Sequence, residues 1–210
     1  MKCVTQRVWL AFIVTQVTTL TSHNATVKQW GDDFLGMEFW VAFMRHVPKD
    51  IPRQTLTLYI TNPASSTTRV NIVSHGLSGS PIQDDYDVSP TTTLTATLKS
   101  DLIVQKVGKS TQSVYVQSDA KVQVQAMMDY TGDSSFSSGG FNVLPVTSLG
   151  YEYVIATHCD TMFCAIVILA IQNDVGVTVN LRVNTSDPDT IQLKYKGTTY
   201  LDGENIQENR

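Results

Sequence analysis

Apolar and polar residues alternate along much of the chain, which is typical of β-strands that bury one face and expose the other to water. In residues 56–61 (LTLYIT), the two leucines and the isoleucine fall on one side, and the threonines and Tyr59 fall on the other. Residues 69–74 (RVNIVS) place Val70 and Ile72 on an inner face in the same way. The Asn-Pro pair at 62–63 interrupts the alternation, so we expect these two strands to form an antiparallel hairpin.

The same alternation marks two segments in the middle of the chain. Residues 113–117 (SVYVQ) and 121–127 (KVQVQAM) each have an inner apolar face, and the Ser118-Asp119 pair predicts a turn between them. Counted in this way, residues 36–130 hold about seven short strands and no helix, which is typical of a β-sandwich of the immunoglobulin or fibronectin type. The inner positions of the two segments are Val114, Val116, Val122, Val124 and Ala126.

A short pattern occurs twice in the chain. Residues 36–41 (GMEFWV) and residues 150–155 (GYEYVI) both read Gly, any residue, Glu, an aromatic residue and two large apolar residues. Alternating or apolar segments that predict strands follow the second copy at 165–171, 177–183 and 191–197. We therefore expect an all-β fold of tandem antiparallel β-sandwich modules at residues 31–139 and 140–210, joined at a Ser/Gly-rich linker (134–141). The second module contains too few strands to close its sheets, so we expect it to be truncated; a propeller-like arrangement of the repeated hairpins is the alternative fold.

The first 22 residues predict a secretory signal peptide. Lys2 and Arg7 precede an apolar run at 8–20, which is too short to span a bilayer comfortably, and the small residues Thr21 and Ser22 follow it. An N-terminal anchor or a buried first strand is the alternative. We expect a secreted, extracellular protein that is not inserted in a membrane once the signal is removed.

In a secreted protein, the cysteines can form a disulfide and two sequons can be glycosylated. Cys3 belongs to the predicted signal, which leaves Cys159 and Cys164, and in an oxidising compartment this pair predicts a short-loop disulfide. Asn24 and Asn184 begin Asn-x-Ser/Thr tripeptides and are predicted glycosylation sites. Only 16% of the residues are charged and no Lys/Arg block occurs, so we expect a globular protein with no nucleic-acid partner.

Several of these segments together resemble the N-terminal domain of the IgG-Fc-binding protein family. The resemblance rests on residues 36–44 (GMEFWVAFM), 56–63 (LTLYITNP), 67–74 (TTRVNIVS), 114–127 (VYVQSDAKVQVQAM) and above all 141–157 (FNVLPVTSLGYEYVIAT), within about residues 31–200. It implies a non-catalytic extracellular binding domain of secreted, mucus-associated proteins, with immunoglobulin Fc or a mucin-like glycoprotein as partner. It assigns no contact residues.

The residue types needed for catalysis or metal binding occur without the required spacing. Residues 75–80 (HGLSGS) lack the Gly-x-Ser-x-Gly spacing of a nucleophile elbow, and we interpret them as a loop. His158 beside the two cysteines has the ligand types of a zinc site, and Asp84, Asp85 and Asp87 have those of a calcium site, but a disulfide-closed loop and a solvated loop are the simpler interpretations. We interpret Glu38 and Glu152, at equivalent repeat positions, as structural residues. We therefore expect no enzyme activity, cofactor or metal.

Aromatic residues are the remaining candidates for a binding face. Trp30, Trp40, Tyr59 and Tyr86 have the side chains that anchor protein interfaces. Trp40 alternates with Phe39 and Val41, so we expect it to be packed between the modules, as part of the core, instead. The favoured function is a secreted module that binds an extracellular protein or glycoprotein; a structural or adhesive spacer and a carbohydrate-binding β-sandwich are the alternatives.

Overall fold

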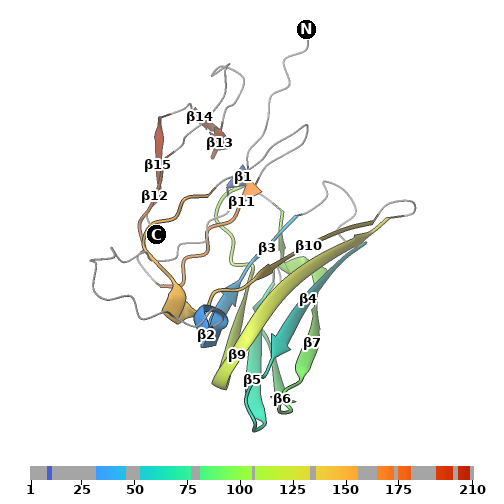
Figure 1. The fold of residues 1–210 in the computed structure, drawn as a ribbon. Helices are drawn as coiled ribbons and strands as arrows, with labels where there is room; N and C mark the ends of the chain where they lie inside the picture. The colour runs from blue at the N-terminus through green and yellow to red at the C-terminus, as the bar shows by residue number, and fades with distance from the viewer. Residues whose placement is uncertain are drawn as a thin grey trace, which may run out of the picture.

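A computed structural model describes residues 9–10, 32–45, 53–76, 81–105, 107–132, 136–155, 165–172, 175–180, 193–200 and 203–208. These residues form strands joined by loops and three-residue 3₁₀ turns, and none of their helices is long or apolar enough to cross a membrane. The turns are η1 (Asp32–Phe34), η3 (Ser100–Leu102) and η4 (Val146–Ser148). The predicted all-β class is confirmed (Figure 1).

A curled antiparallel sheet of seven strands dominates the fold (Figure 1). Its central strand is β9, which is 19 residues long and is paired along both edges. The first half of β9 pairs with β5 and β2, and its second half pairs with β4 and β10, while β6 and β7 extend the sheet beyond β5 and β4. The strands are β2 (Leu35–Val41), β4 (Gln54–Thr61), β5 (Thr68–His75), β6 (Ile82–Val88), β7 (Thr93–Leu98), β9 (Ser113–Thr131) and β10 (Phe136–Asn142).

The inner face of this sheet carries one hydrophobic core. The alternating residues that the sequence assigned to inner faces are all at most 1% exposed and belong to a single cluster that both halves of the sheet share. Each fully buried aliphatic side chain of this kind contributes about 1.5–3 kcal/mol relative to an exposed one. The strand predictions are therefore confirmed for Leu56, Leu58, Ile60, Val70, Ile72, Val114, Val116, Val122, Val124 and Ala126.

The predicted strand pairing is wrong in two places. The segments at 113–117 and 121–127 form one continuous strand, which bends at Ser118 without a turn. The Ser118 hydroxyl donates to the Ala120 carbonyl at 2.7 Å at this bend. On the neighbouring strand β2, a register shift between Gly36 and Glu38 accommodates the extra residues of β9. Strands β4 and β5 do not form a hairpin with each other either. Each pairs with a different half of β9, because the chain crosses from one half to the other at Asn62.

Asn62 stabilises this crossing from a fully buried position. Its Nδ2 donates to the carbonyls of Ser66, Val88 and Ser89 at 2.8, 2.9 and 3.3 Å, and its Oδ1 accepts from the Ala64 N–H at 2.9 Å. One side chain therefore ties the β4–β5 connection to the β6–β7 connection at the bend.

The described part of the predicted Ser/Gly-rich linker, residues 136–141, is a strand. Residues 136–142 form β10, in which Gly140 pairs with Met127 of β9, so the expected module boundary after residue 139 falls inside a strand. A Cβ on Gly140 would lie 2.9 Å from the Met127 Sδ and 3.1 Å from the Ala126 carbonyl oxygen, so the glycine lets β10 lie close to β9.

Outside the large sheet, the described strands are short. Residues 150–155, the second copy of the repeated pattern, form no strand, and Tyr151 and Val154 are 65% and 102% exposed. Of the strand predicted at 165–171, only residues 165–166 form a strand, β11. Near the C-terminus, β15 carries Ile206, which is buried against Tyr195. The strand pairs are β1 (Trp9–Leu10) with β11 (Ala165–Ile166), β3 (Phe43–Met44) with β8 (Ile103–Val104), β12 (Val177–Asn180) with β15 (Asn205–Glu208), and β13 (Leu193–Tyr195) with β14 (Thr198–Tyr200).

Candidate functional site

The predicted covalent sites lie outside the described residues. These are the cysteines Cys159 and Cys164 and the sequon asparagines Asn24 and Asn184. The aromatic candidate Trp30 and the zinc-ligand candidate His158 also lie outside the described residues. The disulfide and the glycosylation sites stay predictions. The predicted signal peptide also stays a prediction, because only Trp9 and Leu10 of residues 1–22 are described, and they pair in parallel with β11.

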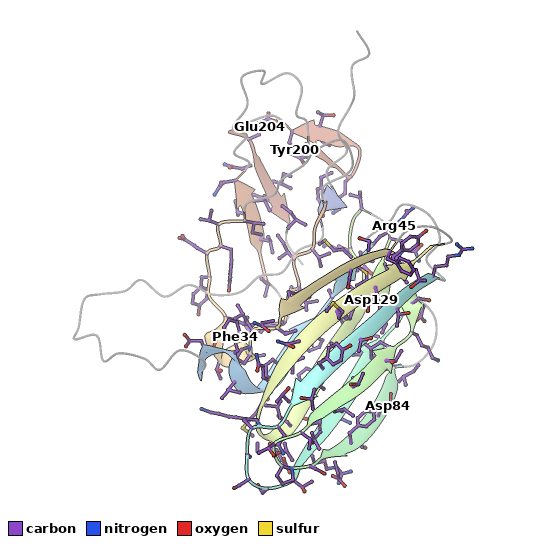
Figure 2. The ribbon with its side chains drawn as sticks, turned by 45° about the vertical axis from the view of Figure 1, so that its right-hand side comes forward. Phe34, Arg45, Asp84, Asp129, Tyr200 and Glu204 are labelled. Atoms are coloured by element: carbon purple, nitrogen blue, oxygen red, sulfur yellow. The ribbon has the colours of Figure 1, made fainter. Side chains whose placement is uncertain are left out.

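The described acidic residues do not gather into a metal site. Asp84 lies on β6 and Asp129 on β9, well apart in Figure 2, and Asp85 and Asp87 alternate with Asp84 so that they project from the opposite face of β6. No group of three or more His, Cys, Asp or Glu in the described part of the chain is arranged to hold a metal ion. The two repeat glutamates are not equivalent, because Glu38 is in β2 and Glu152 is in a segment without a strand.

Trp40 lies on the solvent side of the sheet, which corrects the prediction that it is packed in the core. Its neighbours Phe39 and Val41 are 0% and 1% exposed on the inner face, so alternation turns the Trp40 ring outward, where it is partly exposed. All three residues are large and apolar, so the pattern alone did not show which face they use.

Trp40 belongs to an aromatic cluster that we define as Trp40, Tyr115 and His75, from strands β2, β9 and β5. Trp40 and Tyr115 are paired across the strands, with ring centroids 4.8 Å apart and planes inclined by 38°. The His75 ring is 6.5 Å from Trp40 at 18°, nearly parallel to it. His75 pairs with Ser113 of β9, two residues before Tyr115, and Ser113 is only 8% exposed.

A row of polar side chains crosses the same face beside the cluster. Glu38 pairs with Gln117, Gln117 with Asn71, and Asn71 with Asp85, so the row runs over β2, β9, β5 and β6. At the β6 end these groups bond to one another: Asn71 Nδ2 donates to Asp85 Oδ1 at 3.0 Å, and the Arg69 guanidinium is 3.8 Å from Asp85.

The end of the row next to the cluster is open. Glu38 and Gln117 form no hydrogen bond or ion pair with side chains in the described ranges, and the same holds for the Tyr115 hydroxyl. Burial, and secondarily the negative charge of Glu38, raises the pKa of Tyr115, so its phenol stays protonated at neutral pH and can donate a hydrogen bond. The arrangement offers a ligand three aromatic rings, a carboxylate, an amide and a hydroxyl.

The other two aromatic candidates do not join this cluster. Tyr59 lies on the outer face of the other half of the sheet, paired with Gln125 and Thr95. Tyr86 packs against the core, where burial and the charge of Asp84 raise its pKa. The sequence did indicate that Tyr115 and Gln117 face outward, opposite Val114 and Val116, but it gave no sign that His75 and Trp40 would lie beside them.

Comparison with known proteins leaves the family open. No protein-family model and no curated protein matches the chain. Among solved structures the chain is similar to Thermotoga maritima protein 1070, with a TM-score of 0.36 and 15% identity over 51% of this chain and 91% of that one. A similarity this weak indicates neither a family nor a function. The relation to the IgG-Fc-binding family therefore stays a prediction.

Proposed function

We propose that this protein is a secreted, non-catalytic module that binds an extracellular protein or glycoprotein through the aromatic cluster and the open end of the polar row. The observation that supports this most is the solvent-side position of Trp40, next to Tyr115 and beside Glu38 and Gln117. Trp and Tyr are enriched among residues that dominate binding energy, because they bury much area at small entropic cost.

The scaffold suits a binding surface. The cluster is built on three neighbouring strands whose inner residues lie in the main core, so its geometry is held by the sheet and not by loops. A rigid surface loses little conformational entropy when a partner binds. Immunoglobulin Fc and mucins are the partners that the resemblance implies.

Surface plasmon resonance of the secreted full chain against Fc, mucins and a panel of extracellular glycoproteins tests the proposal. We expect at least one partner to bind, and Trp40→Ala to weaken that binding by about 30-fold, the size of an interface hot spot. Tyr59→Ala is the matched control, because it removes a partly exposed aromatic ring from the outer face of the same sheet. Equal affinities for the two variants would reject the proposed face.

A further inference from the structure

We propose that the aromatic cluster and Glu38 together form a site for a cationic side chain, an arginine of the partner protein; this inference rests on the proposed function. A cation within about 6 Å of an aromatic centroid is attracted to the ring face, most strongly for tryptophan. Trp40 supplies that ring, and Tyr115 and His75 extend the aromatic surface around it.

Glu38 supplies the opposite charge at the correct place. It is two residues before Trp40 on β2 and therefore on the same face, about 7 Å along the strand. No described residue forms an ion pair with it, whereas Asp85 at the other end of the row is already engaged by Arg69 and Asn71. Glu38 is thus the carboxylate that remains available to a ligand.

The charge balance of this face favours a basic partner. On strands β2, β5 and β6 it carries the carboxylates of Glu38, Asp85 and Asp87 against the guanidinium of Arg69, and on β9 Asp119 and Lys121 offset each other. The whole chain is also negative, with a formal charge of -4. Such a field increases the rate at which basic proteins associate and makes their binding sensitive to salt.

The shape of the site favours a guanidinium over an ammonium group. A guanidinium is flat, so it can stack on the Trp40 ring while its edge donates two hydrogen bonds to the Glu38 carboxylate. Gln117, paired with Glu38, adds an amide oxygen as a further acceptor. A lysine ammonium would contact the ring or the carboxylate as a point charge without this double match.

Titration of the full chain with an arginine-containing peptide, and with the same peptide carrying citrulline, tests the inference. Citrulline keeps the shape of arginine but has no charge. We expect the arginine peptide to bind, more weakly as salt rises, and the citrulline peptide to bind at least about tenfold more weakly. Glu38→Gln should weaken arginine-peptide binding about threefold to tenfold. Asp87→Asn, which removes a carboxylate on the same face far from the rings, should change it less than about twofold.

Three results would overturn the inference. They are equal binding of the two peptides, no binding of the arginine peptide at millimolar concentration, and an unchanged affinity for Glu38→Gln. Salt-insensitive competition by neutral methyl glycosides would identify a sugar site in place of the cation site. If partner binding is still lost in Trp40→Ala in any of these cases, the proposed function stands and only the chemistry of the partner is wrong.

Discussion

Gly36 and Pro145 are in direct contact where the chain after β10 passes along the edge of β2. A Cβ added to Gly36 would lie 2.2 Å from the Pro145 Cβ, which no packed structure permits. The contact belongs to a small junction: Phe39 forms an isolated bridge with Pro145, and the Ser148 hydroxyl donates to the Asp33 carbonyl at 3.0 Å. The 145–148 segment thereby covers the edge of the strand that carries Trp40.

Replacing Gly36 tests this junction. Gly36→Ala should lower the free energy of unfolding by about 1–3 kcal/mol, because the proline and its backbone must move to accept the methyl group. Gly139→Ala is the control, since a Cβ there meets no atom within 4 Å. Urea denaturation of the two variants measures the difference, and equal midpoints would mean that the contact with Pro145 is not tight.

Asn62 provides a second stability test. Asn62→Ala removes the amide that serves the carbonyls of Ser66, Val88 and Ser89, and leaves a buried acceptor unsatisfied. We expect a loss of about 2 kcal/mol or more in the free energy of unfolding. Asn71→Ala, which removes one exposed bond to Asp85, should cost less than about 1 kcal/mol. If Asn62→Ala lowers the free energy of unfolding as little as the control does, the Asn62 hydrogen bonds do not stabilise the two connections.

The strand predictions succeeded where the information was local. Alternation identifies Leu56, Leu58 and Ile60 as inner residues because every second side chain on a strand faces the same way. Pairing is not local, so the sequence joined β4 to β5, whereas each binds a separate half of β9. Nothing in the composition distinguishes a turn at Ser118 from the bend that the structure has.

The candidate site required the same non-local information. Residues 40, 75 and 115 meet only through the pairing of β2, β5 and β9. The repeated pattern at 36–41 and 150–155 shows that similar local sequences need not adopt the same structure. The first copy is a strand that pairs with β9, whereas the second forms no strand and its large side chains are exposed. A short pattern becomes a strand only where a neighbour satisfies its backbone groups.

The stability of the strands should be uneven along the chain. β4 is paired on both edges by β7 and β9 over the main core, whereas β13 pairs with the three-residue β14. We expect hydrogen exchange to be far slower for the amides of Leu56 and Ile60 than for that of Tyr195, because strands with few buried contacts open locally. Equal protection would show that the C-terminal strands unfold together with the large sheet.

Tyr153 gives a prediction for alkaline pH. Partial burial raises its pKa to about 12 even though the side chain is 40% exposed, and Gly150 N–H donates to its hydroxyl at 2.5 Å. An unfolded chain ionises this phenol near pH 10, so the folded state keeps its full stability below pH 10 and loses stability as the pH rises from 10 to 12. Near-ultraviolet phenolate titration should lose its highest-pH component in Tyr153→Phe. A titration curve that loses a component near pH 10 instead would show that Tyr153 is hydrated.

The most direct test of the aromatic cluster as the binding face is the ratio of two dissociation constants for one extracellular partner. Trp40→Ala and Tyr59→Ala each remove a partly exposed aromatic ring from the same sheet, and only Trp40 contacts Tyr115 and His75. Circular dichroism first confirms that both variants are folded, and surface plasmon resonance then measures their affinities. We expect Trp40→Ala to bind about 30-fold more weakly than wild type and Tyr59→Ala to stay within about twofold of it. A folded Trp40→Ala variant that binds as tightly as Tyr59→Ala would contradict this expectation.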